Sequence, residues 1–78
     1  MTQLTKLQNL NITINDVVTK EYRLMYQFGA WITKEIICAE NDYEAIFDSD
    51  AAYSESRLQN WQHGVALWCG NRKVKTYR

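Results

Sequence analysis

Between residues 20 and 28, a strict alternation of side chains constrains the fold of this chain more than any other feature. Every second position carries a bulky apolar side chain: Tyr22, Leu24, Tyr26 and Phe28. Because successive side chains of a strand point to opposite faces, this period of two predicts a β-strand. After Gly29-Ala30, the β-branched and aromatic residues of the range 31–39 predict a second strand, and glycine at the first loop position favours a type II′ hairpin.

The next segment has the signals of a helix N-terminus. The Asn41 side chain can accept a hydrogen bond from a backbone amide two or three residues later, and Glu44 can reach back to the cap, as in a capping box. At about 100° per residue, one sector of this helix gathers apolar side chains: Tyr43, Phe47, Ala51, Leu58 and Trp61. This predicts an amphipathic helix of about four to five turns that buries this sector and ends near residues 62–64.

Residues 64–78 predict a second hairpin, because strand-like residues flank the turn pair Gly70-Asn71. A two-residue loop pairs residues across the hairpin: Cys69 with Arg72, Trp68 with Lys73, Leu67 with Val74, and Ala66 with Lys75. Since directly opposed residues share a face, Trp68, Lys73 and Lys75 are expected on one side of the sheet.

Together these elements predict an α+β fold, in which one central amphipathic helix packs on one face of a small antiparallel sheet, in β-β-α-β-β order. An additional edge strand is predicted near Leu10 to Ile14. The 78 residues are expected to form a single domain, 1–78, because so short a chain cannot divide its core. The polar N-terminus lacks the regions of a signal peptide, and no apolar stretch approaches the roughly 20 residues that cross a bilayer, which predicts a cytoplasmic protein.

Residues able to perform chemistry are few. His63 is the only histidine, and it lies near the predicted helix end, where a capping contact is its ordinary role. Cys38 and Cys69 lie within apolar runs, which predicts buried, reduced thiols. Their spacing with His63 does not match a metal site. We therefore expect no catalytic residue, no metal and no cofactor.

Charge is strongly segregated along the chain, although the net charge is zero. Residues 35–55 carry a charge of −7 without a single Lys or Arg, residues 57–78 carry +5 without an acid, and residues 1–34 contribute +2. Such blocks give a molecule with an acidic flank and a basic flank, a field that orients a partner during encounter. The alternative is that the two blocks lie side by side and neutralise each other.

The predicted helix presents part of this acidic block as one exposed acidic ridge, formed by Glu44, Asp48, Asp50 and Glu55. Ten aromatic residues exceed what so small a core is expected to enclose, and aromatic residues dominate interface hot spots. Apolar anchors beside the ridge are expected from Tyr43, Tyr53 and Trp68. These features predict a non-catalytic protein-binding function, in which the ridge imitates a row of phosphates and occupies the groove of a nucleic-acid-binding protein.

Nucleic-acid binding is the alternative function. The basic, aromatic C-terminal hairpin combines residues that neutralise phosphates with a ring for stacking: Trp68, Arg72, Lys73 and Lys75. Against this interpretation, the isoelectric point is near 6.5, whereas dedicated nucleic-acid-binding domains have values above about 9. An unpaired sheet edge or the surplus of aromatic residues would also allow two copies of the chain to pair.

Several short segments resemble small bacteriophage proteins that disable host machinery. Similarity to Dmd-type antitoxins lies in Thr33-Lys34-Glu35-Ile36, in Asp42 and in Arg72-Lys73-Val74. Similarity to anti-CRISPR proteins and to a short phage inhibitor of bacterial RNA polymerase lies in size, fold plan and the helix entry from Ala39-Glu40-Asn41-Asp42 to Glu44-Ala45. This resemblance covers residues 26–78 and transfers no functional residue. It implies a stoichiometric inhibitor in the cytoplasm of a bacterial host, which blocks a nuclease, toxin or CRISPR effector.

Overall fold

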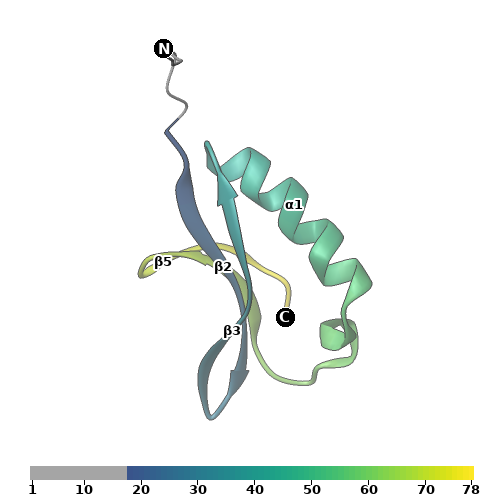
Figure 1. The fold of residues 1–78 in the computed structure, drawn as a ribbon. Coiled ribbons are helices and arrows are strands. Elements are labelled where there is room, and N and C mark those ends of the chain that lie inside the picture. The colour runs from purple at the N-terminus through teal and green to yellow at the C-terminus, as the bar shows by residue number, and fades with distance from the viewer. Residues whose placement is uncertain (1–17) are drawn as a thin grey trace, which may run out of the picture.

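The computed structural model describes residues 18–78, which form a four-stranded sheet and one α-helix (Figure 1). In chain order the elements are β2 (Lys20–Phe28), β3 (Ala30–Ala39), the helix α1 (Asp42–Glu55), the 3-10 helix η1 (Arg57–Asn60), β4 (Val65–Cys69) and β5 (Arg72–Thr76). The predicted α+β fold and its β-β-α-β-β order are confirmed. The edge strand predicted near Leu10 to Ile14 lies outside the described residues.

All neighbouring strands of the sheet are antiparallel, in the order β3-β2-β4-β5. Helix α1 lies along one face of the sheet and, with η1, carries the chain from β3 back to β4 (Figure 1). In the part of the chain that the structure describes, no helix covers the opposite face, which we call the open face. The central strands β2 and β4 supply four of the eight buried residues of the core cluster: Tyr22, Leu24, Val65 and Leu67.

The core lies between the sheet and α1, and the strands contribute its large side chains. Tyr22, Leu24 and Leu67 are fully buried, whereas the buried residues of α1 are the small Ala45 and Ser49. A helix face of small side chains lets the helix backbone approach the sheet closely, and the large strand residues then fill the space between the layers.

The sector of α1 that the sequence predicts to be buried faces solvent instead. Tyr43 is 84% exposed and Phe47 is 74% exposed, and Ala51 is exposed as well. The prediction is wrong because it ranks the two sides of the helix by hydrophobicity alone. In the folded chain the side with the smaller residues, Ala45 and Ser49, packs against the sheet.

Helix α1 ends at Glu55, well before the predicted end near residues 62–64. The Ser56 side chain accepts a hydrogen bond from the Leu58 amide over 3.1 Å, which starts η1. Leu58 and Trp61 still contact the core, but they do so from η1 and the loop that follows it. No helix among residues 18–78 is long and apolar enough to span a membrane.

The predicted start of the helix is confirmed. Asn41 Oδ1 accepts a hydrogen bond from the Glu44 amide over 2.9 Å. The Glu44 carboxylate also reaches back, but it accepts a hydrogen bond from the Glu40 amide, over 3.4 Å, and not from that of the cap residue.

A β-bulge interrupts the pairing of β2 with β3. Leu24 lies opposite Glu35 and Met25 lies opposite Thr33, so Lys34 has no partner residue on β2. Such a bulge bends its strand and redirects the extra side chain. At the tip of this hairpin a single residue, Gly29, separates the strands with φ 77°, where the sequence predicts a two-residue loop.

A second bulge changes the register of β4 against β5. The two predicted pairs nearest the turn are confirmed, but Leu67 lies opposite Lys75 and not opposite Val74. This shift by one residue turns Lys75 to the side of the sheet that carries α1. The expectation that Lys75 shares a face with Trp68 and Lys73 is therefore wrong.

Both thiols are free. Cys69 is half-buried, but Cys38 is exposed, so its predicted burial is wrong. Cys38 lies between Ile37 and Ala39, which are buried against the core. Because side chains alternate along a strand, Cys38 points to the open face.

Candidate functional site

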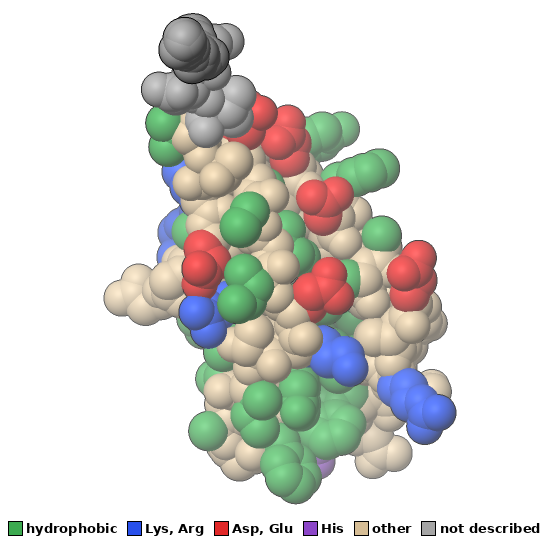
Figure 2. Space-filling model, in the orientation of Figure 1, with side chains coloured by type: hydrophobic (Ala, Val, Ile, Leu, Met, Phe, Trp, Pro, Cys, Tyr) green, Lys and Arg blue, Asp and Glu red, His purple; other side chains and the backbone are tan. Residues whose placement is uncertain are grey.

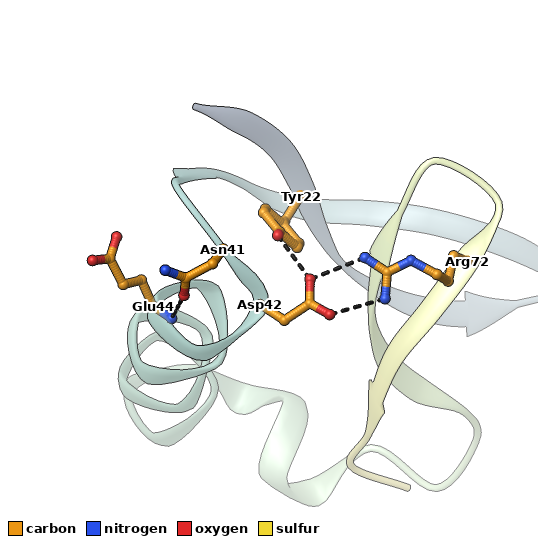
Figure 3. Close-up of polar contacts among 5 residues, drawn as sticks. All are labelled: Tyr22, Asn41, Asp42, Glu44 and Arg72. Atoms are coloured by element: carbon orange, nitrogen blue, oxygen red, sulfur yellow. Dashed lines mark hydrogen bonds and ion pairs between the residues drawn. The ribbon is translucent and has the colours of Figure 1, made fainter. Parts of the chain in front are cut away.

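Asp42, the first residue of α1, is held by two other elements of the fold (Figure 3). The Arg72 guanidinium donates two hydrogen bonds of 2.9 Å to the two oxygens of this carboxylate, and the Tyr22 hydroxyl donates a third, of 2.8 Å. The hydrogen bonds from Arg72 and Tyr22 lower the pKa of Asp42 to about 2. Burial and the hydrogen bond to Asp42 raise the pKa of Tyr22 to about 12.

Asp50 makes a second link between α1 and the C-terminal residues. Lys75 Nζ donates to Asp50 Oδ1 over 2.8 Å, and the Tyr77 hydroxyl donates to the same oxygen. Burial alone would raise the pKa of Asp50, but the hydrogen bonds from Lys75 and Tyr77 outweigh it and leave this pKa below its ordinary value. The Tyr77 oxygen also lies 2.9 Å from Ser49 Oγ.

The sequence predicts Asp50 as part of the exposed acidic ridge, but in the structure Asp50 is paired with the C-terminal residues and does not belong to it. It follows Asp48 by two residues, which is about 200° of helix rotation, so the two carboxylates point to opposite sides of α1. The second bulge supplies the partner of Asp50, because it brings Lys75 to the helix side of β5.

The other three predicted ridge residues, Glu44, Asp48 and Glu55, are exposed. Their spacing of four and seven residues places them on one side of the helix. Tyr43 and Phe47 lie next to two of these acids, Glu44 and Asp48, and the four residues line a shallow hollow of about 330 Å³. We call these five residues, Tyr43, Glu44, Phe47, Asp48 and Glu55, the aromatic-acidic face.

The two charge blocks neutralise each other only in part. Arg72 and Lys75 form ion pairs with Asp42 and Asp50. The other five acids of the block are exposed and have no ion-pair partner within residues 18–78: Glu35, Glu40, Glu44, Asp48 and Glu55. Figure 2 shows acidic side chains spread over the upper part of the molecule in this view, with hydrophobic side chains projecting beside them.

The three predicted aromatic anchors do not lie together. Tyr43 is on the aromatic-acidic face, but Tyr53 is half-buried and stacks on Tyr77, with 4.4 Å between ring centroids. Trp68 points to the open face, on the other side of the sheet. Phe47 takes their place beside Tyr43, and the sequence signal that identifies it is its spacing of four residues from Tyr43, which puts both rings on one side of a helix.

The four residues of the alternative nucleic-acid site are divided between the two faces of the sheet. Arg72 and Lys75 are engaged with acids of α1. Trp68 and Lys73 remain together on the open face, where Trp31 joins them. The two indoles meet edge to face with centroids 5.4 Å apart, and Lys73 Nζ lies 5.6 Å from the Trp31 ring and 5.4 Å from the Trp68 ring.

The residues considered for metal binding or catalysis are not brought together. His63 is exposed in the loop before β4, with its ring edge-on to Trp61 at 5.8 Å. It follows η1 and does not cap α1. Among residues 18–78 there is no group of three or more His, Cys, Asp or Glu that could hold a metal ion.

No family model matches this chain, and comparison with curated proteins and with solved structures also finds no match.

Proposed function

We propose that this chain is a non-catalytic protein-binding module, and that it blocks a nucleic-acid-binding protein by docking its aromatic-acidic face into that protein's basic groove. One observation carries the proposal. Tyr43 and Phe47, 84% and 74% exposed, lie on one side of α1 beside carboxylates that have no ion-pair partner in the described structure.

The exposure of these two rings supports a docking role. Burying a large apolar side chain stabilises a protein by roughly 1.5–3 kcal/mol, and α1 forgoes this contribution at both positions. Scattered exposed apolar residues are common on protein surfaces, but these two rings lie one helical turn apart and line the same hollow. Aromatic side chains of this kind contribute most to the binding energy at the centre of an interface.

The acids indicate the chemistry of the partner. At about 1.5 Å of rise per residue, the carboxylates of Glu44, Asp48 and Glu55 follow one another at roughly 6 Å and 10 Å along the helix. A row of negative charge is complementary to a groove lined by Lys and Arg, and it accelerates encounter with such a groove. Grooves of this kind bind nucleic-acid backbones, so their occupation by α1 excludes the nucleic acid.

The resemblance to phage inhibitors is consistent with the same proposal and narrows the partner to a nuclease, toxin or CRISPR effector of a bacterial host. Stoichiometric occupation of a groove requires no reaction at the face itself. The aromatic-acidic face offers carboxylates and rings, which are suited to binding.

A capture experiment with matched variants tests the proposal. Glu44→Lys and Phe47→Ser change the face, whereas Glu21→Lys and Ile36→Ser make the same changes on the open face. We expect bacterial proteins that remain bound after nuclease treatment to be retained by wild type and both controls. Loss of at least tenfold in binding is expected for each face variant.

The identity and behaviour of the captured protein complete the test. It should bind nucleic acid in the absence of this chain, and an equimolar amount of the chain should prevent that binding. Equal capture by face and control variants would contradict the docking proposal, as would a captured protein that binds nucleic acid equally well with the chain present.

Nucleic-acid binding remains the second candidate, and the Trp31–Trp68 pair beneath Lys73 is the observation that favours it. Stacking of bases on such rings is tolerant of sequence. Within residues 18–78 the open face offers little to neutralise phosphates, since its other cation, Arg23, is paired with Glu21 over 2.7 Å. A mobility shift of single-stranded DNA at low salt, lost in Lys73→Gln, would support this function, and no shift would exclude it.

A further inference from the structure

We propose that a second site, which shares no lining residue with the aromatic-acidic face, binds small aromatic carboxylates. It is a pocket of about 330 Å³ between the Phe28 end of β2, the bulge of β3 and η1. Its lining residues are Tyr26, Phe28, Lys34, Arg57, Leu58 and Trp61. Pockets for small ligands are of this size and combine apolar walls with a few polar groups.

The aromatic walls of the pocket are fixed by contacts within the fold. The Trp61 indole donates a hydrogen bond from Nε1 to the Gln27 carbonyl over 2.9 Å, which sets the direction of its ring. Tyr26 meets this ring edge to face at 5.3 Å, and Phe28 is tilted against it at 6.0 Å. Leu58 forms a buried floor. A ligand ring therefore enters a preformed apolar site.

The wall formed by Phe28 is not sealed by other parts of the described chain. This side chain is 67% exposed, although it packs against Trp61. Figure 2 shows hydrophobic side chains gathered at the lower end of the molecule, with Lys and Arg side chains at the upper margin of this patch. An apolar group bound there would cover the exposed rings while its charged end reaches the margin.

Two cations that line the pocket, Lys34 and Arg57, favour a negatively charged ligand. Lys34 is the extra residue of the first bulge, so no residue of β2 lies opposite it. Arg57 is the first residue of η1. Neither forms an ion pair with any residue in the range 18–78. Both line the aromatic pocket, so the ligand that complements this site carries a negative charge next to an aromatic ring.

Acids on the far side of the two cations limit how tightly an anion can bind. Lys34 and Arg57 also line a neighbouring hollow of about 540 Å³, together with Glu35, Asp48 and Glu55. These carboxylates attract the same cations and repel a bound anion. Removal of one of them should therefore strengthen binding of an aromatic carboxylate, a direction of change that a purely apolar pocket does not predict.

Titration with 3-phenylpropionate tests the site, with the neutral 3-phenylpropionamide as the matched ligand. We expect saturable NMR shifts at the indole N–H of Trp61, with the indoles of Trp31 and Trp68 on the open face as internal controls. The acid should bind about fivefold more tightly than the amide. This preference should disappear in the double variant Lys34→Gln/Arg57→Gln and persist in Lys20→Gln, which removes a cation at the other end of β2.

Glu55→Gln should tighten binding of the acid by about twofold and leave binding of the amide unchanged. Equal affinity for acid and amide in wild type, or shifts spread over all three indoles, would overturn the proposal. The result is independent of the proposed docking function, because Glu44→Lys and Phe47→Ser alter the aromatic-acidic face without touching this pocket. Binding of the acid should be retained in both variants.

Discussion

Arg72 at the start of β5 donates two hydrogen bonds of 2.9 Å to Asp42 at the start of α1, although the two residues are 30 positions apart in the chain. Together with the contact of Lys75 to Asp50, this ion pair holds both the first turn and the middle of α1 against the sheet. Both contacts are made with the helix rotated so that Ala45 and Ser49 pack on the sheet and Tyr43 and Phe47 face solvent.

The charge on Asp42 should make stability depend on acidic pH. Its pKa falls from 3.8 to about 2 on folding, so the unfolded chain binds the proton more readily than the folded chain. The contribution of this group is therefore present above about pH 4 and is lost as the pH falls towards about 2. We expect urea unfolding midpoints of wild type to fall more steeply over this window than those of Asp42→Asn.

Asp50 also has a lowered pKa, and it remains in both proteins, so the difference between the two pH profiles reports on Asp42 alone. Parallel profiles would show that the ion pair with Arg72 does not persist in solution.

Replacement of Tyr22 by Phe should remove one hydrogen bond to a charged group from the buried side of the Asp42 network. Tyr22 is fully buried, and its hydroxyl donates to Asp42 over 2.8 Å. We expect Tyr22→Phe to lower the free energy of unfolding by about 1–2 kcal/mol near neutral pH. Tyr43→Phe, at an exposed position, is the matched control and should change this energy by less than about 0.5 kcal/mol. Equal effects of the two substitutions would contradict the network.

The orientation of α1 predicts that substitutions at two nearby positions of the helix change stability by very different amounts. Ser49 is fully buried, so a larger Leu side chain there would have to displace the atoms packed around it. Ser49→Leu should therefore destabilise the protein by about 1–3 kcal/mol or more, whereas Phe47→Ser should change stability by no more than about 0.5 kcal/mol. Thermal unfolding followed by circular dichroism measures both. A large loss in Phe47→Ser would mean that this ring is part of the core.

Gly64 provides a test of packing between the loop before β4 and the open face. A Cβ at this position would lie 2.7 Å from Gln27 Oε1 and 2.8 Å from Trp31 Cη2. Because a Trp ring moves less easily than a Gln amide, we expect Gly64→Ala to cost about 1–3 kcal/mol. In a double-mutant cycle, Trp31→Ala should relieve part of this cost.

Gly70→Ala is the matched control for this cycle. Gly70 has φ 61°, and a Cβ at this residue would have no atom within 4 Å apart from those of its chain neighbours. Its substitution should cost about 1 kcal/mol through backbone strain alone, and Trp31→Ala should leave that cost unchanged. Additive effects of Gly64→Ala and Trp31→Ala would contradict the close approach of this ring.

Features that depend on neighbouring residues could be predicted from the sequence. The alternation of Tyr22, Leu24, Tyr26 and Phe28 determined the strand β2, and the side chain of Asn41 determined the start of α1. Turn residues placed both hairpins, and the helix spacing of Glu44, Asp48 and Glu55 placed these three acids on one side. Each of these features is decided within a few residues of the chain, where backbone geometry and side-chain period act directly.

Only the tertiary structure decided which side of α1 is buried and which charges are exposed. Hydrophobicity favours burial of Tyr43 and Phe47, but the close approach of helix and sheet admits only small residues such as Ala45 and Ser49. The bulge that turns Lys75 towards Asp50 likewise depends on the pairing of two strands. These outcomes depend on the fit between elements distant in sequence, and a local pattern of residues carries no information about that fit.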